Sequence, residues 1–424
     1  MSSLTDSFYR FQDLQTKLLV SCPKDPTSPG GLFVVDFAMK NISKILEADC
    51  RGIARCSNGF YIATNSNGIL KLDDDLNIIQ TYDVPALDLH GMKLRDNNLL
   101  YVVETSHNAI GIYQTDPFER IDEIKISPYS DDQNHINDIW LSNSSIYVSM
   151  FSLNGGWKDN KGSFDGVIAE YHLQTKELIK VHIENLQLPH SVTIIDNEIL
   201  FCESLQLSLN KEHDTLATLG GYTRGLDFDG WNFYIGQSEM RHLSRILSIV
   251  PNVSIDCGIH IFDTVKRTNR FLQLPAKQVY EIMILNKPEL RSDLPESIHF
   301  NQDDALKCIS INEWHDAEEH HRWMAAKTTT VKIFKNHSSD TLIIDSLNAF
   351  PGLYKCSIFV NQQLIGMITY ENPDSRRDSF NISSCSSGPI EIAFVVDLLW
   401  SPSQQLNNTD TRNLGMGFKY IGFS

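Results

Sequence analysis

One short phrase returns six times along this 424-residue chain. Each copy begins with a polar residue, continues through a small hydrophobic run and a turn, and ends in a β-rich stretch near a Thr, Ser or Glu. The opening residues are Arg51, His90, His135, His190, Arg224 and Glu281. Repeats about 35–55 residues long that each hold several short strands are typical of a β-propeller, where one repeat forms one blade. The sequence therefore predicts an all-β chain with a six-bladed β-propeller.

The six opening residues are expected to converge. In a propeller the innermost strand of each blade lines a central channel, so residues that open these strands face one small volume. Three imidazoles, two guanidinium groups and one carboxylate would meet there. The number of blades stays open between six and seven, because the strand GLFVVDF near residue 31 could close the last blade by pairing with the strands after GIHIFD.

Four of the opening residues have side chains that bind metal ions. Three imidazoles and one carboxylate are a sufficient ligand set for a catalytic divalent metal such as zinc, manganese or iron. The predicted metal ligands are His90, His135, His190 and Glu281.

The same residues permit acid–base chemistry without a metal. Histidine titrates near neutral pH, and a neighbouring arginine stabilises an oxyanion or enolate. Arg51 and Arg224 are suited to holding a carboxylate or phosphate. All six opening residues are therefore candidate catalytic residues. Five more residues are expected to orient them or to contact the substrate: Glu104, Asn137, Asp138, Trp157 and Glu203.

A structural interpretation competes with this one. Polar residues that open inner propeller strands often satisfy backbone groups of the adjacent blades. The Trp residues, Trp157 among them, also pack in cores more often than they stack on sugar rings. The run HDAEEHH at 315–321 mimics a metal motif, but it is expected to be a solvated loop.

Composition excludes some function classes. The chain has 36 Lys and Arg against 53 Asp and Glu, a net charge of −17, and no basic cluster of the kind that nucleic acids require. The eight cysteines are scattered without a CxxC pair. The N-terminus lacks a signal-peptide pattern, and no apolar run is long enough to span a bilayer. These features predict a cytoplasmic protein without a membrane span or a nucleic-acid partner.

The pattern of strands and turns divides the chain. Apolar residues at three-to-four spacing in SFYRFQDLQTKLLV predict an N-terminal helical segment within residues 1–27. Short β runs separated by Asn, Asp, Gly and Ser clusters assign the propeller to residues 28–290. A linker rich in Pro and charges is expected at 291–308, and strand-like runs over 309–424 predict a C-terminal β-sandwich, jelly-roll-like in type.

Two phrases of the C-terminal part resemble a known module. EWHDAEEHHRWMAAKTTTVKIF opens this part, and LLWSPSQQLNNTDTRNLGMGFKYIGF closes it. The module is a β-sandwich attached to bacterial proteins of cell-surface polysaccharide assembly. The resemblance implies a glycan context and a carbohydrate-binding or assembly role. The matching positions are Trp314, Glu318, Arg322, Trp323, Pro402, Asp410, Arg412, Leu414 and Gly415.

The phrases HINDIWL at 135–141 and GYTRGLDFDG at 221–230 resemble an uncharacterised bacterial β-propeller family. This resemblance implies the fold and no particular reaction. Gluconolactonase-type propellers place mainly carboxylates and Asn at their calcium sites, whereas five of the six opening residues here are His or Arg. The set therefore favours an anionic ligand over calcium.

Together these patterns predict a carbohydrate-directed protein of bacterial surface-polysaccharide biosynthesis or modification. The channel is expected to bind an anionic sugar or sugar nucleotide, as a lyase, epimerase or hydrolase. The alternative is a non-catalytic glycan-binding or scaffold protein of a polysaccharide-assembly complex. In that case the partners would contact two long loops, 152–166 and 240–256, which are expected to rim the channel.

Overall fold

The computed structural model describes residues 8–65, 67–86, 88–158, 165–195, 197–239, 247, 250–264, 266–286, 294–302, 305, 308–309, 313–335, 339–385, 388–406 and 408–424. Strands dominate these residues. The helical elements among them are η1 (Tyr9–Phe11), η2 (Thr105–His107) and α3 (Pro402–Gln405). The prediction of an all-β chain is confirmed in this coarse form. In the part of the chain so described, no helix has the length and apolar character needed to cross a bilayer.

The chain divides into two compact units. The first unit comprises residues 1–262 and 269–287, and the second comprises 263–268 and 288–424. The expected rim loops contain 159–164, 240–246 and 248–249, which lie outside the described residues.

The described residues of the first unit form six four-stranded antiparallel sheets. One sheet joins the two ends of the unit in the order β24 (Glu281–Ile284), β1 (Lys17–Cys22), β2 (Gly31–Asp36) and β3 (Asn41–Leu46). The other five follow in chain order. They are β4 (Cys50–Cys56), β5 (Gly59–Thr64), β6 (Gly68–Leu72) and β7 (Ile78–Tyr82); β8 (Leu89–Arg95), β9 (Leu99–Glu104), β10 (Ala109–Thr115) and β11 (Phe118–Lys125); β12 (Ile136–Leu141), β13 (Ser145–Met150), β14 (Gly166–His172) and β15 (Leu178–Leu186); β16 (Pro189–Ile195), β17 (Glu198–Glu203), β18 (Ser208–Lys211) and β19 (Asp214–Thr218); β20 (Tyr222–Phe228), β21 (Asn232–Ser238), β22 (Gly258–Asp263) and β23 (Thr268–Gln273).

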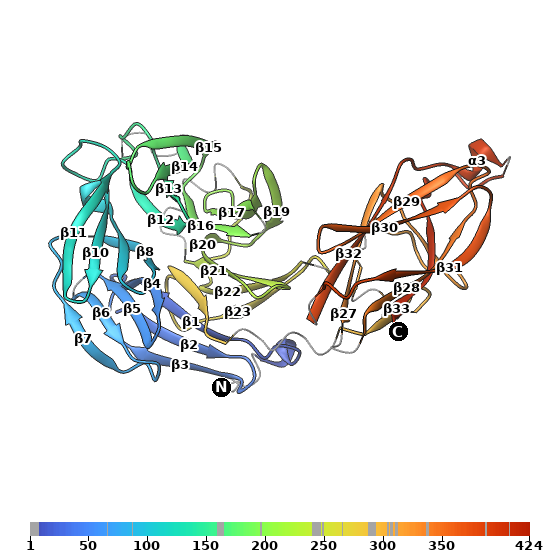
Figure 1. The fold of residues 1–424 in the computed structure, drawn as a ribbon. Helices are drawn as coiled ribbons and strands as arrows, with labels where there is room; N and C mark the ends of the chain where they lie inside the picture. The colour runs from blue at the N-terminus through green and yellow to red at the C-terminus, as the bar shows by residue number, and fades with distance from the viewer. Residues whose placement is uncertain are drawn as a thin grey trace. The chain divides into compact units, whose positions relative to one another are not determined.

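The inner strands of the six sheets form a closed ring. In the order β24, β4, β8, β12, β16, β20 and back to β24, each strand contacts the next. Figure 1 shows the sheets following one another around the first unit. We call these six strands the ring strands. The arrangement is propeller-like, because each ring strand is the inner edge of its own antiparallel sheet.

Apolar side chains fill the space between neighbouring sheets. One cluster joins Val20 of the end-joining sheet to Tyr234 and Ile259 of the sheet that begins with β20. Phe8 and Phe11, at η1, pack onto the same cluster. Phe8 and Phe11 therefore belong to the core of the first unit.

The expectation of a helical N-terminal segment is wrong for Lys17–Cys22, which form β1. This strand pairs with β2 on one side and with β24 on the other, so it is buried along nearly its whole length. A strand covered on both faces has a continuous apolar run, which sequence periodicity does not distinguish from a buried helix.

The second unit contains two antiparallel sheets among its described residues. One has the order β25 (Ser297–His299), β33 (Gly417–Phe423), β28 (Thr341–Asn348) and β31 (Asp374–Asn381), and β26 (Arg322–Trp323) also pairs with β33. The other has the order β27 (Thr328–Lys335), β32 (Gly388–Val396), β29 (Tyr354–Val360) and β30 (Gln363–Tyr370). Alternate residues of β28 and β29 are buried, so each sheet has one buried face.

The expected linker at 291–308 is not all linker, because Ser297–His299 pair with β33. The opening and closing phrases of the second unit also meet in space. Arg322 and Trp323 pair with β33, and Arg412 Nη2 lies 2.8 Å from Glu318 Oε1. These contacts hold the two phrases together.

Candidate functional site

Five ring strands carry a β-bulge near their first residues. In β4 the register with β5 shifts between Cys50 and Ile53, and comparable shifts occur near the starts of β8, β12, β16 and β20. A bulge leaves residues out of the ladder and turns their side chains. Residues at these shifts include Arg51, His90, Asn137, Ser191 and Arg224. In β12 the bulge holds Asn137, whereas His135 lies just before the strand.

Arg51 and His90 are directly hydrogen-bonded. Arg51 Nη1 lies 2.9 Å from His90 Nε2 and 3.0 Å from an Asp88 carboxylate oxygen. On the other side of the imidazole, His90 Nδ1 lies 2.5 Å from the Thr105 hydroxyl. This hydroxyl donates to the Ile136 carbonyl oxygen. His90 therefore carries its proton on Nδ1 and accepts from Arg51 through Nε2. Burial lowers the pKa of His90 well below the ordinary value, and Arg51 lowers it further, so His90 is neutral.

His190 is anchored in the same way. Its Nδ1 lies 3.0 Å from the Leu188 carbonyl oxygen and 2.7 Å from the Ser204 hydroxyl, which donates to the Thr223 carbonyl. Burial lowers the pKa of His190 well below the ordinary value, and the Arg224 charge adds to the effect. In both histidines Nδ1 ties the ring strand to a hydroxyl that binds the next sheet. These two Nδ1 atoms therefore have a structural role, which is to connect neighbouring sheets.

His135 differs because its partner is a carboxylate. Asp132 Oδ2 lies 2.8 Å from His135 Nδ1, and Asp132 Oδ1 accepts the His135 backbone N–H at 3.0 Å. The backbone of His135 has a φ of 47°, in the left-handed region that non-glycine residues seldom adopt. Its ring centroid is 4.3 Å from that of Trp157 and 4.4 Å from that of Phe151. A carboxylate on Nδ1 fixes the tautomer and leaves Nε2 for proton transfer.

Tyr280 occupies the centre of the ring. It precedes β24, yet its hydroxyl donates to the Asn137 carbonyl oxygen on β12 at 2.9 Å. Its ring centroid is 5.3 Å from that of His90 and 5.6 Å from Cζ of Arg224. The residue is 1% exposed, and burial raises its pKa well above the ordinary tyrosine value. Tyr280 is therefore a buried, neutral hydrogen-bond donor between opposite ring strands.

Ser238 and Gln278 bind Arg224. Its Nε donates to the Ser238 hydroxyl at 3.1 Å, and its Nη2 donates to the side-chain oxygen of Gln278. The guanidinium also lies over the Tyr222 ring, with its Cζ atom 5.7 Å from the ring centroid. These contacts fix the position of the Arg224 guanidinium, whose planar shape suits a carboxylate or phosphate.

A second charged layer lies one to three residues further along the ring strands. Lys93 Nζ is 2.7 Å from Glu281 Oε1, and Glu281 Oε2 accepts the Ile53 N–H at 2.6 Å. Asp138 Oδ2 accepts the Ser191 N–H at 2.8 Å. These side chains line a cavity of about 20 Å³, roughly the space of one water molecule. Burial, reinforced by the charge of Glu281, raises the pKa of Asp138 to about 7.

The structure brings five of the six predicted opening residues together. Arg51 contacts His90, whose ring centroid lies 5.3 Å from that of His135. His190 lies within electrostatic range of His135 and Arg224. Glu281 belongs instead to the second layer, and Tyr280 precedes it at the level of the histidines. We call Arg51, His90, His135, His190 and Arg224 the basic cluster.

The predicted substrate-contacting residues are divided. Trp157 packs against His135 with the two ring planes tilted by 43°, and it donates from Nε1 to the Asp132 carbonyl oxygen at 3.2 Å. Asn137 is fully buried and donates to the carbonyl oxygens of His135 and Pro189, while its Oδ1 has no partner in the described part of the chain. Asp138 lies in the second layer.

Glu104 and Glu203 bind neighbouring protein groups. Both oxygens of Glu104 accept from Arg120, at 2.9 and 2.7 Å, and the Tyr113 hydroxyl donates to one of them. Glu203 accepts the Gln187 N–H at 2.7 Å. Both residues end the second strand of a sheet, and their partners lie in their own sheets or in the loop before it. A contact from either residue to the basic cluster is therefore not supported.

The predicted metal ligands do not form a ligand set. His90 uses both ring nitrogens on protein partners, and Glu281 is bound to Lys93 in the second layer. Among the described residues, no three His, Cys, Asp or Glu side chains are arranged to hold a metal ion. The donor groups thus fit hydrogen bonding better than coordination.

The sequence interpretation missed two residues of this site. Asp132 stands three positions before His135, and that spacing in DDQNH was a usable signal for a carboxylate–imidazole pair. The signal for Tyr280 was weaker, namely its position directly before Glu281 in VYEIMIL. It was missed because the repeated phrase was defined by a polar opening residue, and tyrosine is aromatic.

Residues 36–292 match the family described as "Domain of unknown function (DUF4915)". The chain belongs to the DUF4915 family. The matched range covers all six ring strands, and it includes HINDIWL and GYTRGLDFDG. No curated protein matches the sequence of this DUF4915 member.

Several solved structures are similar to part of this DUF4915 protein. A chain of the nidogen/laminin complex is 12% identical with a TM-score of 0.49, and the match covers 64% of this chain and 99% of that chain. A candidate gluconolactonase is 11% identical with a TM-score of 0.40, covering 65% and 84%. The hydrazine synthase of Kuenenia stuttgartiensis is 12% identical with a TM-score of 0.37, covering 58% and 90%.

Proposed function

We propose that the first unit is a six-bladed propeller whose basic cluster binds an anionic sugar or sugar nucleotide, and that His135 removes a proton from this ligand. The observation that carries the proposal is the Asp132–His135 pair, whose imidazole ring centroid lies 5.3 Å from that of His90, the ring that Arg51 contacts. This places a candidate base and candidate anion-binding groups within one small region of the ring.

The contacts of His135 support its proposed role as the base. Asp132 holds the proton on Nδ1, so Nε2 is the basic nitrogen, and the same carboxylate stabilises the imidazolium that forms. Trp157 and Phe151 fix the orientation of the ring. His90 and His190 are weaker candidates, because their Nδ1 atoms bind neutral groups and burial keeps them neutral.

The anionic ligand is supported by charge. Beyond the effect of burial, Arg51, which also pairs with Asp88, and Arg224 both lower the pKa of His90, so two guanidinium groups lie near this imidazole. A carboxylate bound by Arg224 would acidify the adjacent C–H, and the guanidinium would stabilise the resulting enolate. His135 would accept that proton on Nε2. Protonation of the enolate by water on the opposite face gives epimerisation, and departure of the β-substituent as an alcohol, with the proton that His135 holds, gives elimination.

Hydrogen exchange tests the proton transfer directly. The wild-type protein is incubated in D2O with glucuronate, galacturonate or their nucleotide-linked forms, and loss of the C5 proton signal is followed by NMR. We expect exchange with the wild type, exchange lowered at least 100-fold in His135→Asn, and wild-type exchange in His213→Asn, which changes an exposed histidine.

Calorimetric titration of the same compounds separates binding from chemistry. We expect His135→Asn to retain binding, Arg224→Gln to weaken it at least tenfold, and neutral glucose and galactose not to compete. Binding without exchange in the wild type would refute the base and leave a binding function. Equal binding of neutral and anionic sugars would overturn the proposal.

A second function, glycan binding by the second unit, is supported by one surface. The second unit is proposed to be a jelly-roll-like sandwich. On β33, Tyr420 extends over Gly422, where any side chain would meet its hydroxyl. Arg377, paired with Asp345 at 2.5 Å, lies across the same sheet face. A flat aromatic ring beside polar groups suits a pyranose. If this is the main role, Tyr420→Ala removes polysaccharide retention in affinity electrophoresis, while His135→Asn does not.

The compartment is also a proposal. All eight cysteines lie in the described part of the chain and are free thiols, most of them buried. Burial raises the pKa of Cys202 and Cys356 above the ordinary thiol value, which makes them unreactive. These features support a reducing, cytoplasmic location, and fractionation of the native host tests it.

A further inference from the structure

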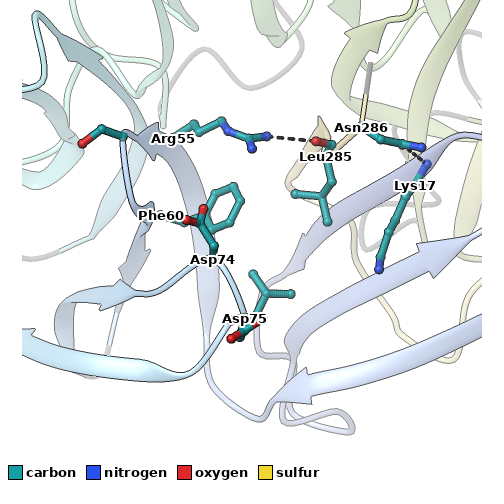
Figure 2. A pocket seen from close by; sticks show the side chains of 9 residues that line it. Lys17, Arg55, Phe60, Asp74, Asp75, Leu285 and Asn286 are labelled. Carbon is teal, nitrogen blue, oxygen red and sulfur yellow. Dashed lines mark hydrogen bonds between the residues drawn. The ribbon is translucent and has the colours of Figure 1, made fainter. Parts of the chain in front are cut away.

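A groove of about 670 Å³ lies at the seam where the ring of the first unit closes. It is formed between the end-joining sheet and the sheet of β4–β7, at the end of the ring strands opposite the basic cluster. Its volume is in the range of small-molecule sites. Figure 2 shows the groove with Arg55 and Leu285 above it and Asp75 below. The lining residues are Lys17, Arg55, Ser57, Phe60, Asp74, Asp75, Leu76, Leu285 and Asn286.

One wall of the groove is cationic and held in place. Arg55 Nη1 donates to the Leu285 carbonyl oxygen at 3.0 Å, and its guanidinium lies over the Phe60 ring, 5.3 Å from the centroid. Lys17 is fixed through its backbone N–H, which donates to Asn286 Oδ1 at 2.5 Å. An arginine anchored by stacking loses little side-chain entropy when it binds an anion.

The facing wall is acidic and is built on a tight turn. Asp74 and Asp75 lie between β6 and β7, where the Asn77 backbone N–H donates to an Asp73 carboxylate oxygen at 2.8 Å. The Leu76 backbone N–H donates to the Asp73 carbonyl oxygen at 3.0 Å, with Leu76 at a φ of 65°. This turn fixes the positions from which the Asp74 and Asp75 carboxylates extend.

The two walls do not neutralise each other. Neither Asp74 nor Asp75 forms an ion pair with a described residue, and Arg55 likewise has no acidic partner there; Lys17 approaches Asp36 at 3.7 Å. Between the walls lie the apolar side chains of Phe60, Leu76 and Leu285. The groove thus offers opposite charges at its two sides and an apolar floor between them.

We propose that this groove binds a small zwitterion of the amino-acid or dipeptide class. The carboxylate would pair with Arg55 and Lys17, the ammonium would pair with Asp74 and Asp75, and an apolar side chain would cover Phe60 and Leu285. Charge-assisted contacts at both ends of one ligand give specificity for compounds that carry both charges.

Binding there also bears on ring closure. Lys17 belongs to β1, Leu285 follows β24, and Arg55 belongs to β4, so one ligand contacts three strands that meet at the seam. A ligand that binds the folded ring and not the unfolded chain stabilises the fold by mass action. The midpoint of thermal unfolding therefore rises with ligand concentration.

The experiment uses the full chain and three matched probes: the dipeptide Ala-Phe, N-acetyl-Ala-Phe without the ammonium, and Ala-Phe-amide without the carboxylate. Calorimetric titration is expected to give at least tenfold weaker binding for each blocked form. Arg55→Gln is expected to weaken Ala-Phe at least tenfold and to leave the amide unchanged. Asp74→Asn/Asp75→Asn is expected to weaken Ala-Phe similarly and to leave the acetylated form unchanged.

Two controls keep the result specific to the groove. Arg95→Gln changes the arginine that ends the neighbouring strand β8, and Asp83→Asn changes an exposed carboxylate just after β7. Both are expected to bind Ala-Phe like the wild type. Equal affinity for the three probes, or no binding by a wild type that unfolds cooperatively, would overturn the proposal. Neither outcome affects the basic cluster, which has its own ligands and assay.

Discussion

The hydroxyl of Tyr280 donates to the carbonyl oxygen of Asn137 at 2.9 Å, from one side of the ring of strands to the other. β24 and β12 stand three places apart in a ring of six, so this bond joins opposite strands. Tyr280 therefore crosses the ring of strands at the level of the histidines, with its side chain 5.3 Å from the His90 ring. A ligand that reaches the basic cluster would contact this tyrosine.

Substitution of Tyr280 should lower the free energy of unfolding, and alanine should lower it more than phenylalanine. Tyr280→Phe loses one buried hydrogen bond and leaves the Asn137 carbonyl unpaired, which should cost about 1–2 kcal/mol of unfolding free energy. Tyr280→Ala also leaves a cavity and should cost about 3–5 kcal/mol. Urea unfolding of the three proteins measures the difference. An alanine variant as stable as the wild type would show that the ring does not depend on a filled centre.

Asp132→Asn should impair proton transfer without impairing binding. The amide no longer stabilises the imidazolium and can favour the wrong tautomer of His135, so hexuronate exchange should fall about 10²–10⁴-fold. Affinity should change less than about twofold, because Asp132 is not proposed to touch the ligand. Asp131→Asn, one residue earlier, is the control. Equal loss of affinity and exchange would assign Asp132 a folding role instead.

Stability should depend on pH through Asp138. Its folded-state pKa is raised to about 7, above the unfolded value of about 3.9. Between these values the folded state binds more protons, so this contribution to stability falls as pH rises through the window. In Asp138→Asn the amide oxygen still accepts the Ser191 N–H and no charge is buried. We expect the variant to gain on the order of 2 kcal/mol relative to wild type between pH 5 and pH 8.

Urea unfolding at several pH values measures this gain. Asp83→Asn, at an exposed position, should follow the wild-type pH profile. Parallel profiles for Asp138→Asn and wild type would contradict the buried charge as the cause.

Chelation should leave the proposed exchange reaction unchanged. His90 and Glu281 are occupied by Arg51 and Lys93, and the acid–base route needs no coordinated ion. The protein is dialysed against EDTA, its metal content is measured, and exchange is compared before and after dialysis. Loss of exchange that is restored by one equivalent of zinc, manganese or iron would favour a metal-bound site.

Arg120→Met should destabilise the first unit strongly. Glu104 is fully buried and receives two hydrogen bonds from Arg120, so the substitution leaves a buried carboxylate without its main partner. The expected cost is about 3 kcal/mol. Lys176→Met, which removes the more exposed pair with Asp122, should cost less than about 1 kcal/mol. Thermal unfolding compares the two variants.

Much of the first unit could be predicted from the repeated phrase. Arg51, His90, His190 and Arg224 lie at ring-strand bulges, as a residue opening each inner strand would. The sequence assigned the wrong opening residue to two ring strands, His135 in place of Asn137 and Glu281 in place of Tyr280. Strand register is set by cross-strand pairing rather than by spacing along the chain. Asn137 occupies the bulge of β12, and Tyr280 crosses the ring. His135 and Glu281 were chosen because imidazole and carboxylate groups bind metals and transfer protons.

The functions of individual side chains were harder to predict. His90 and His135 look equivalent in the sequence, and their difference arises from Thr105 on one Nδ1 and Asp132 on the other. Glu104 seemed near the channel because it ends a strand, yet Arg120 from β11 binds it. Such partners come from elsewhere in the sheet, and no single-sequence pattern reports them.

The pairing of β24 with β1 also has a consequence for synthesis on the ribosome. Ser21 and Glu281 are 260 residues apart, so β1 cannot pair with β24 until nearly the whole unit has been translated. At about 5–20 residues per second this delay is roughly 13–50 s. Throughout that interval the nascent chain carries an apolar strand with an open edge. The timing makes this edge a natural binding place for chaperones and a point where a prematurely terminated chain would aggregate.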